Sequence, residues 1–449
     1  DHRDLHSFPT RRSSDLTMNP KREILSSASI AVSNERIEAI GDAADIREKY
    51  NGRAQFVDGH GKVILPGLIN CHTHISMSLQ KGITLAVPEG LYKVMWPVEK
   101  GLTPEDVYVG ALIGGGEALL GGTTTIVDHY FHMEEITRAT IQLGLRGFLG
   151  HTIMSRLGPI TGEKELREGI DFAGRWKGKH PLVTPMLAPH ASDTVALEWL
   201  QQIRTEADRQ GVRIHMHLAQ STRELAYIKE QYQKGCVEYL SEMGFLKPDV
   251  FTAHCIFIDE RELDILAKSG ANPIYCPMGH ALSGKSMRAW ELINKGANVL
   301  IGTDCVTSNN VMDITGELRI AGAAQRLLTG DSTAMPSMKI LEMVTVDAAK
   351  ALGMDGQLGS LQPGYLADLV VLNMHGLHAV PNYSLLDNII FTCSGRDVEM
   401  VMVNGRIVVE GGKLCNVDEE ELIRLADVKG RGLMKRAVEH DPTLSWLWK

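Results

Sequence analysis

PGLINCHTH, residues 66–74, ends an apolar run that begins at Val63. The aliphatic residues of this run predict a buried strand. His72 and His74 are two positions apart, so their side chains lie on the same face of an extended chain and can share one metal ion. Imidazole is a good ligand for zinc and related metals, but a catalytic zinc needs three or four protein ligands and an open position for water. The remaining ligands must come from other parts of the chain.

The chain after this motif alternates short apolar strands with longer helical segments, the pattern of βα units around a parallel sheet. Eight strands are predicted, at 63–70, 123–130, 146–152, 183–189, 212–218, 250–255, 271–276 and 299–304. Eight such units close a (β/α)8 barrel. The predicted fold class is therefore α/β, with a TIM-like barrel over residues 65–361.

Short alternating strands flank the barrel, with turn signals at Asn404-Gly405 and Gly411-Gly412. We expect the two flanks, 17–64 and 362–416, to meet in one small β-sandwich. The charged, helix-periodic stretch that follows predicts a C-terminal helix and tail over 417–449.

The first sixteen residues, DHRDLHSFPTRRSSDL, have no apolar segment of the kind that signal peptides contain. They resemble a translated sequencing adapter. We therefore expect residues 1–16 to be a disordered, non-native extension that has replaced a genuine first strand.

The amino-acid composition of the chain limits the kinds of molecule that the protein is expected to bind. A net charge of -9 and a pI near 6.0 argue against nucleic-acid binding. No apolar run approaches the ~20 residues that cross a bilayer, so we expect no membrane span. The seven cysteines are odd in number and show no CxxC spacing, which fits a reducing cytoplasm better than a disulfide framework. A small-molecule substrate is the expected partner.

Further candidate ligands stand at the ends of predicted strands. His215 and His217 close the fifth strand, His254 the sixth and Asp304 the eighth. In a closed parallel barrel these ends converge on one face, so one pocket is predicted. A lone pair of histidines is more often structural, but four such positions together favour a metal site. Alternation points both His215 and His217 inward and leaves the choice between them open.

These segments match a known family. PGLINCHTH, HLAQ (217–220), TAHC (252–255) and GTDCVTSNN (302–310) resemble the amidohydrolase superfamily, and most closely its methylthioadenosine/S-adenosylhomocysteine deaminases and triazine chlorohydrolases or aminohydrolases. GSLQPGYLADLVVLN and VMVNGRIVVEGG resemble the sandwich strands of that family. The resemblance runs from about residue 17 to residue 412.

The resemblance implies one divalent metal ion, zinc before iron or manganese, held by His72, His74, His217 and Asp304. It implies that Asp304 is the general base and that His254 polarises the developing oxyanion or leaving group. It implies no carboxylated lysine, so Lys81 is expected to be a solvated charge.

The reaction expected from the resemblance is hydrolytic removal of an amino group from an N-heteroaromatic ring by hydroxide formed at the metal. Deaminases of this branch carry glutamate where this chain has Gln220, and an amide cannot cycle a proton at neutral pH. Glu224 or His280 could relay the proton instead. The alternatives are a chlorohydrolase or N-alkylaminohydrolase of a triazine-like ring, or a catalytically weak, metal-containing binding protein.

Substrate contacts are predicted from weaker signals, each with a structural alternative. Glu99 resembles an acidic residue that reaches the substrate's polar end, and a homodimer is plausible from the resemblance. Asp128 is expected to tie down a loop. The predicted substrate-binding residues are Trp96, Glu99, His151, His190, Ser308 and Asn309.

Overall fold

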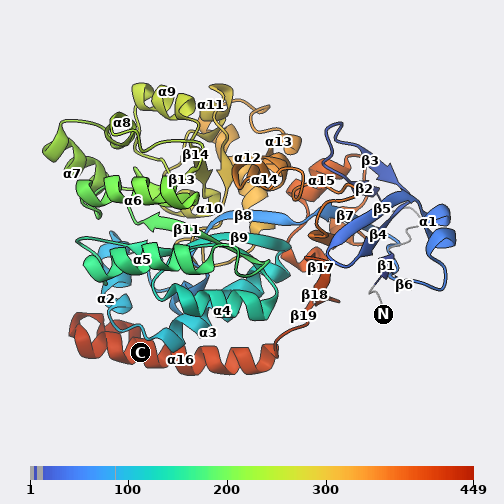
Figure 1. The fold of residues 1–449 in the computed structure, drawn as a ribbon, viewed down its shortest axis with the longest axis horizontal. Coiled ribbons are helices and arrows are strands. Elements are labelled where there is room, and N and C mark those ends of the chain that lie inside the picture. The colour runs from blue at the N-terminus through green and yellow to red at the C-terminus, as the bar shows by residue number, and fades with distance from the viewer. Residues whose placement is uncertain (1–4, 8–13, 86, 449) are drawn as a thin grey trace.

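A computed structural model describes residues 5–7, 14–85 and 87–448, with side chains from Asp15 onward. Figure 1 shows the barrel and its surrounding helices at the left and the β-sandwich at the right. Eight parallel strands pair in chain order to form the barrel. They are β8 (Leu68–Thr73), β9 (Thr123–Tyr130), β10 (Arg146–Ile153), β11 (Val183–Pro189), β12 (Arg213–Leu218), β13 (Val250–His254), β14 (Asn272–Tyr275) and β15 (Leu300–Ile301).

The barrel closes between its first and last strands. Thr73 forms a parallel bridge with Asp304, and the Asp304 backbone N–H donates to the carbonyl of His72 over 2.9 Å. Gly302 is needed at this seam, since an added Cβ would lie 2.7 Å from the Cβ of His72. The predicted α/β barrel is therefore confirmed.

One predicted strand, 63–70, is wrong as a single unit. The chain forms β7 (Lys62–Pro66) in the sandwich and then β8 in the barrel. Gly67 separates them: its N–H donates to the carbonyl of Asp368, and its backbone passes so close to Thr124 that an added Cβ would clash. A continuous apolar run concealed the change of sheet because both strands are buried.

Helices surround the barrel and connect its strands. Local signals set their ends: Thr103 and Asp106 form a capping box for α3, and Gly144 ends α4 in the left-handed conformation. The barrel helices are α3 (Pro104–Leu120), α4 (Met133–Leu143), α5 (Glu163–Trp176), α6 (Leu197–Gln210), α7 (Thr222–Tyr232), α8 (Cys236–Glu242), α9 (Glu260–Ser269), α10 (Pro277–Leu282), α11 (Ala289–Asn294), α12 (Ile314–Thr329), α13 (Ser337–Met343) and α14 (Val346–Ala351).

A second group of helical segments lies at the mouth and edges of the barrel. The segment η1 (Ile75–Gln80) follows β8, and the π-helical turn η2 (Leu91–Met95) runs into α2 (Trp96–Glu99). The C-terminal helix α16 (Glu419–His440) packs against α2 and α3, as Figure 1 shows. Helix α15 (Leu385–Phe391) packs against α12 and α13.

The sandwich is built from both flanks of the barrel, as the sequence predicts. Its antiparallel sheet has the order β19-β18-β17-β16-β7, and a second sheet has the order β5-β4-β1-β6. Ile30 and Val32 of the second sheet pack with Ile64, Val371 and Met400 of the first. The strands are β1 (Leu5–Ser7), β4 (Ala28–Ser33), β5 (Arg36–Asp42), β6 (Gln55–Phe56), β16 (Leu369–Asn373), β17 (Val398–Val403), β18 (Arg406–Glu410) and β19 (Lys413–Leu414), with helix α1 (Ala43–Tyr50) at the edge.

We expected residues 1–16 to be disordered, but residues 5–7 and 14–16, which the structure describes, form paired strands. Strand β1 pairs with β4, and β2 (Ser14–Leu16) pairs with β3 (Ile24–Ser26). Leu16 is fully buried because it completes the apolar core between the sandwich and the barrel. Residues 1–4 and 8–13 lie outside the described residues, and the non-native origin of the segment stays a prediction.

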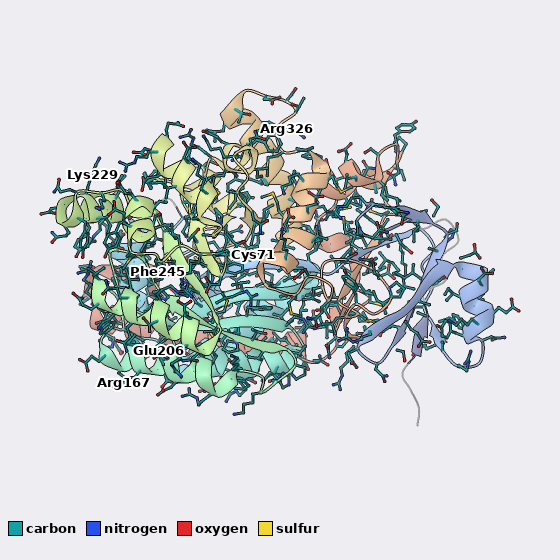
Figure 2. The ribbon with its side chains drawn as sticks, turned by 45° about the horizontal axis from the view of Figure 1, so that its top comes forward. Cys71, Arg167, Glu206, Lys229, Phe245 and Arg326 are labelled. Atoms are coloured by element: carbon teal, nitrogen blue, oxygen red, sulfur yellow. The ribbon has the colours of Figure 1, made fainter. Side chains whose placement is uncertain are left out.

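Apolar and charged side chains separate as in other globular barrels. Figure 2 shows Cys71 at the centre, whereas Arg167 and Lys229 lie on outer helices. Cysteines 71, 236, 255, 276, 305 and 393 are buried free thiols, and Cys415 is exposed. Among the described residues, no helix combines the length and apolar character needed to cross a membrane.

Candidate metal centre

The predicted ligands meet at the carboxyl end of the barrel. His72 lies near the end of β8, and His74 follows it directly. His217 lies on β12, His254 ends β13, and Asp304 follows β15. His254 and Asp304 have positive φ angles of 81° and 61°, a conformation that non-glycine residues rarely adopt and that concentrates at functional sites. The backbone is thus bent at the points where it presents these side chains.

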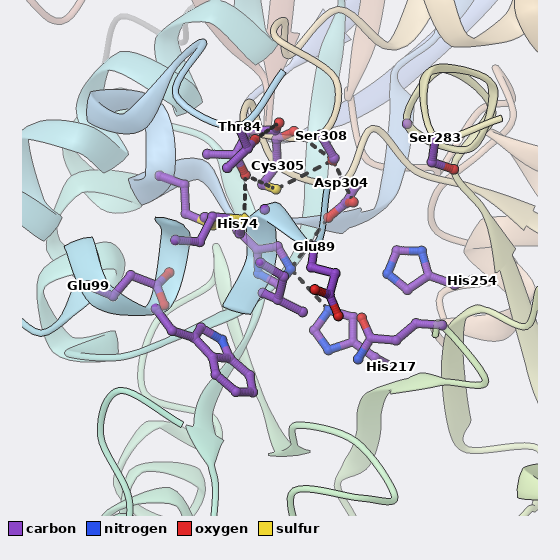
Figure 3. Close-up of a pocket in the computed structure, with 18 of the residues that line it drawn as sticks. His74, Thr84, Glu89, Glu99, His217, His254, Ser283, Asp304, Cys305 and Ser308 are labelled. Carbon is purple, nitrogen blue, oxygen red and sulfur yellow. Dashed lines mark hydrogen bonds and ion pairs between the residues drawn. The ribbon is translucent and has the colours of Figure 1, made fainter. Parts of the chain in front are cut away.

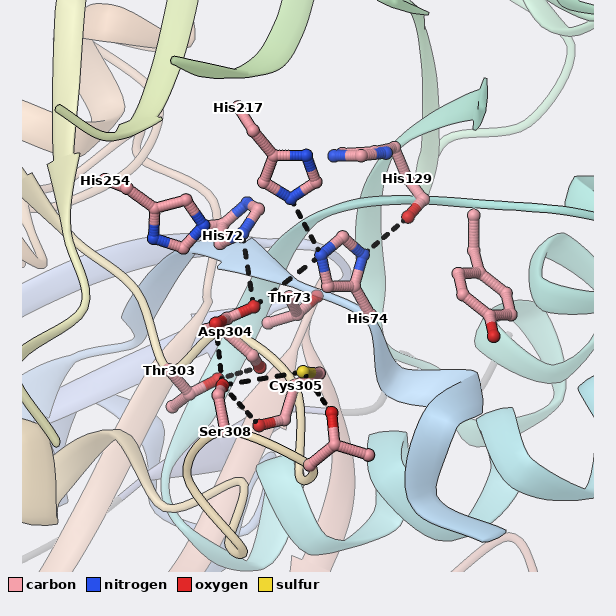
Figure 4. A network of polar contacts seen from close by, with 12 residues as sticks. His72, Thr73, His74, His129, His217, His254, Thr303, Asp304, Cys305 and Ser308 are labelled. Atoms are coloured by element: carbon pink, nitrogen blue, oxygen red, sulfur yellow. Dashed lines mark hydrogen bonds and ion pairs between the residues drawn. The ribbon is translucent and has the colours of Figure 1, made fainter. Parts of the chain in front are cut away.

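Ligand atoms from four residues converge, as Figure 4 shows. The Nε2 atoms of His74 and His217 are 3.2 Å apart. Asp304 Oδ1 lies 3.4 Å from His72 Nε2 and 3.6 Å from His74 Nε2. These separations suit four ligands around one ion, since zinc–ligand bonds of about 2 Å place tetrahedral ligand atoms roughly 3.3 Å apart.

The outer ring nitrogens of two histidines are held by backbone carbonyls. His74 Nδ1 donates to the carbonyl of His129 over 2.7 Å, and His217 Nδ1 donates to the carbonyl of His190 over 3.0 Å. A neutral imidazole carries one proton, so each Nε2 keeps a lone pair that faces the centre.

His215 completes the support of the third histidine. Its Nε2 lies 2.8 Å from His72 Nδ1, which leaves His72 Nε2 directed at the centre. This contact distinguishes the roles of His215 and His217, which strand alternation left open. His217 reaches the cluster of candidate ligand atoms, and His215 contacts the opposite ring nitrogen of His72.

Electrostatics favour cation binding at this cluster. Burial lowers the pKa of His72 to about 3 and lowers the pKa of His217 well below its usual value, so both rings are neutral ligands. Burial alone would raise the pKa of Asp304, but its contact with His72 brings the pKa below its usual range. His72 Nε2 is buried without a hydrogen-bond partner among the described residues. Three imidazoles, one of them with an orphaned ring nitrogen, and a carboxylate fit a divalent metal.

A pocket of about 600 Å³ opens above the cluster, and Figure 3 shows part of its lining. His74, His217, His254 and Asp304 form its polar floor. Its walls are largely apolar, as in sites that enclose a flat organic ring. The apolar lining includes Met77, Leu85, Val87, Leu91, Met95, Phe131, Met154, Ile256 and Leu282.

Four of the predicted substrate contacts line this pocket. Trp96 and His190 lie with their ring centroids 6.2 Å apart, and Ser308 donates to Asp304 Oδ2 over 2.6 Å. Glu99 accepts a hydrogen bond from the Tyr130 hydroxyl at 2.5 Å. Burial raises the pKa of Glu99 to about 7, against the lowering effect of Tyr130. Half-buried Gln220 also lines the pocket.

Two predicted substrate contacts do not line it. His151 points away from the barrel interior and pairs with Glu165 of α5 over 2.8 Å, because its neighbour Thr152 takes the inward position on β10. The side-chain amide of Asn309 is used within the protein, where it donates to the carbonyl of Thr303 and to Glu317. In both cases proximity to a strand end did not reveal which way the side chain turns.

Three further predictions concern residues beside the site. Asp128 ties down the loop after β8, since its Oδ2 accepts from the Ile75 N–H over 2.7 Å and from the Thr73 hydroxyl over 2.8 Å. Lys81 forms an ion pair with Glu117 at 2.9 Å on the surface. Glu224, a predicted proton relay, accepts from the Gln220 N–H and is absent from the described pocket lining. Glu224 therefore holds the backbone of Gln220.

His129 and Tyr130 were missed by the sequence analysis. His129 presents its carbonyl to His74 and its ring to the pocket, and its Nε2 has no partner among the described residues. Tyr130 holds Glu99. The signal was their position at the end of β9, beside Asp128, which the sequence analysis weighed only as a loop anchor.

The barrel, its sandwich and the three-histidine, one-aspartate cluster define a class of metal-dependent hydrolases. The sequence model of the Amidohydrolase family matches residues 63–408. The chain is 34% identical over 426 residues to a 5'-deoxyadenosine deaminase of Methanosarcina acetivorans, covering 94% of this chain and 97% of that protein. The chain belongs to the Amidohydrolase family.

Two further likenesses agree with this assignment. A 5-methylthioadenosine/S-adenosylhomocysteine deaminase of Carboxydothermus hydrogenoformans is 35% identical over 409 residues, which is 90% of this chain and 94% of that protein. The crystal structure of an adenosine deaminase from Xanthomonas campestris, with bound zinc, superposes with a TM-score of 0.89 at 26% identity over 96% of this chain and 98% of that one. A triazine hydrolase variant, at 21% identity and a TM-score of 0.86 over 95% of this chain and 99% of that one, shares the fold.

Proposed function

We propose that this protein is a zinc-dependent aminohydrolase that removes the exocyclic amino group from an adenine-type ring, most favourably in a 5'-modified adenosine. The observation that carries this proposal is the convergence of His72, His74, His217 and Asp304 beneath a pocket that also presents His254. The deaminases among its relatives support the substrate class. The buried free thiols fit a reducing compartment such as the cytoplasm.

The four ligands would hold the metal through three Nε2 atoms and Asp304 Oδ1. When bound there, zinc acts as a Lewis acid that makes a water molecule nucleophilic near neutral pH. The nitrogen-rich donor set suits zinc, and iron or manganese are the alternatives. Metal analysis of the purified protein distinguishes these ions.

Asp304 is the residue best placed to accept a proton from the attacking water. Its Oδ1 faces the ligand cluster, and its low pKa keeps it ionised before reaction. Ser308 donates to Oδ2 and restrains the carboxylate, so the same carboxylate group can later deliver the proton to the departing amine. Asp304→Asn should therefore abolish turnover.

Gln220 determines how the ring nitrogen is stabilised. Its side chain lines the pocket, while Glu224 holds its backbone from below. An amide donates a hydrogen bond to a ring nitrogen but supplies no proton, so His254 or solvent has to complete the transfer. We expect Gln220→Glu to raise kcat for an amino-substituted ring.

A second reaction is favoured by Gln220 itself. Expulsion of chloride or an alkylamine from a triazine-like ring requires less ring protonation than expulsion of ammonia, so an amide would suffice there. The pocket also fits a third class, a metal-containing protein that binds the ring without turnover. Gln220 is the residue that supports both.

The three functions separate in one assay. Product formation is measured with 5'-deoxyadenosine, 5'-methylthioadenosine, S-adenosylhomocysteine, adenosine, free purines, pterins, and amino- and chloro-triazines. Ammonia release from the adenosines, lost in Asp304→Asn, supports the deaminase. Chloride release without ammonia supports the second reaction. Binding without turnover in wild type and in Gln220→Glu would overturn the enzyme assignment. Size-exclusion chromatography of the same sample tests the proposed homodimer.

A further inference from the structure

His280 lies beside the metal centre without contributing to the proposed ligand set. It belongs to α10, is 3% exposed, and lines the pocket. Its Nε2 lies 3.2 Å from Nδ1 of His254. His280 is therefore a polar neighbour of His254, a ring of the pocket floor that lies outside the proposed ligand set.

The direction of the hydrogen bonds follows from the backbone. The N–H of Met287 donates to Nδ1 of His280 over 3.4 Å. A backbone N–H can only donate, so Nδ1 of His280 carries a lone pair and the proton of this ring sits on Nε2. That proton is donated to His254 Nδ1, which must then accept. The proton of the neutral His254 ring is left on Nε2.

The His254 ring is also fixed in orientation. It stacks on His217 at a centroid distance of 5.2 Å and an interplanar angle of 7°, and it meets His72 edge-on at 5.3 Å. Its ligand-type atom lies within 4.8 Å of Asp304 and His72. Because Nδ1 is occupied by His280, Nε2 is the ring nitrogen available to the pocket.

We propose that His280 is a positioning residue that holds His254 in the Nε2–H tautomer, as a hydrogen-bond donor to the oxygen or leaving group. In the opposite tautomer Nε2 would be a lone pair and His254 a competing base. The chain from Met287 through His280 to His254 thus assigns proton acceptance to Asp304 and hydrogen-bond donation to His254. The effect on turnover rests on the proposed function, whereas the tautomer itself does not.

The same residues also meet the geometric requirement for a cation site. His254, His280 and Cys276 place one ligand atom each within 4.8 Å of one another, which is also the geometry of a cation site. Burial raises the pKa of the Cys276 thiol well above its usual value, which favours the neutral thiol. Neutral partners favour the hydrogen-bonded chain over a second metal.

Two substitutions of His280 separate its roles. Gln places an amide N–H near the position of the imidazole Nε2 and keeps a donor to His254, whereas Leu removes the donor at similar volume. In His280→Leu we expect kcat to fall about tenfold to a hundredfold with KM within about threefold, since the loss of one oriented donor has effects of this order or larger. His280→Gln should recover most of that loss.

The tautomer is read directly by NMR of protein labelled with ¹⁵N-histidine, with and without one equivalent of zinc. Signals are assigned with His254→Gln and His280→Gln. We expect both rings to be Nε2–H in the wild type, and His254 to lose this preference in His280→Leu. An Nδ1–H tautomer of His254 in the wild type would overturn the proposal, as would loss of both signals on adding a second zinc equivalent. Equal kcat values for Leu and Gln variants would also overturn it.

Discussion

His215 is a buried residue that contacts His72, one of the proposed metal ligands. Its Nε2 lies 2.8 Å from His72 Nδ1, and its own Nδ1 has no partner among the described residues. Residues that orient a metal-binding histidine typically change metal affinity 10- to 100-fold when they are removed. The ring is enclosed in the barrel, so solvent does not replace the lost contact.

We therefore expect His215→Leu to weaken zinc binding by about 10- to 100-fold, measured by competition with a chromophoric chelator. His215→Gln is the matched variant, because its amide oxygen can still accept from His72 Nδ1, and it should lose less. Equal affinities for the wild type and the Leu variant would show that His72 needs no such support.

Glu99, in the lining of the pocket, is expected to make kcat/KM depend on pH. Burial raises its pKa to about 7, so the side chain is protonated below that pH and becomes a carboxylate acceptor above it. If the carboxylate binds donor groups of the substrate, kcat/KM rises as pH increases through about 7. Glu99→Gln should remove this rise and lower kcat/KM by about tenfold at pH 8, an effect typical of one charged hydrogen bond.

Glu89 is the control for the Glu99 experiment. It lines the same pocket, but its ion pair with Lys93 at 2.6 Å lowers its pKa, so it stays ionised across this range. Glu89→Gln should leave the shape of the pH profile unchanged. A wild-type profile that is already flat between pH 6 and 8 would contradict the role given to Glu99.

At the level of elements, strand ends could be predicted better than side-chain directions. β9 and β11 have the predicted bounds, because each is a short run of β-branched or apolar residues bounded by helical segments. The residues of the proposed ligand set could be expected to meet because the carboxyl ends of parallel strands converge. The direction of His151 and the ties of Asn309 depend on the register within the barrel and on α5 and α12. Single-strand periodicity does not contain that information.

The strand β2 carries an unusual buried charge. Asp15 is fully buried between the sandwich and the barrel, and neither carboxylate oxygen has a partner of full hydrogen-bond geometry in the described part of the chain. Burial raises its pKa to about 7, opposed by the backbone N–H of Ile64. An apolar side chain would fit these surroundings better.

We expect Asp15→Val to stabilise the protein by about 1–3 kcal/mol at pH 8, measured as a higher apparent Tm. The folded-state pKa of about 7 lies above the unfolded value of 3.8, so Asp15 destabilises the fold increasingly from pH 4 to pH 7 and fully above pH 7. The gain from Val should therefore shrink as pH falls towards 4. Asp15→Asn keeps the polarity without the charge and should gain less. An Asp15→Val protein no more stable than wild type at pH 8 would show that the carboxylate has a partner.

At the scale of the whole molecule, the barrel closes at a seam beside the proposed metal centre. His72 and His74 come from the first barrel strand, Asp304 follows the last, and His217 reaches across from β12. Across the seam the described residues meet through the Thr73–Asp304 bridge, the hydrogen bond from the Asp304 N–H to the carbonyl of His72, and two hydrogen bonds between Asn70 and Thr303. A bound ion would join strands that are more than two hundred residues apart in sequence. It would also give the orphaned ring nitrogen of His72 a partner.

Metal binding should therefore stabilise the complete barrel, beyond its local effect on the site. A ligand present at a thousand times its dissociation constant adds about 4 kcal/mol to the free energy of unfolding. We expect zinc to raise the apparent Tm of chelator-treated protein by several degrees, and His217→Gln to reduce this shift without abolishing it. Gly302→Ala, which forces a methyl group against His72, should lower the Tm with and without metal. If zinc binds stoichiometrically but leaves the Tm unchanged, the unfolded chain binds the ion as tightly as the folded chain does. The stability of the seam would then not depend on the ion.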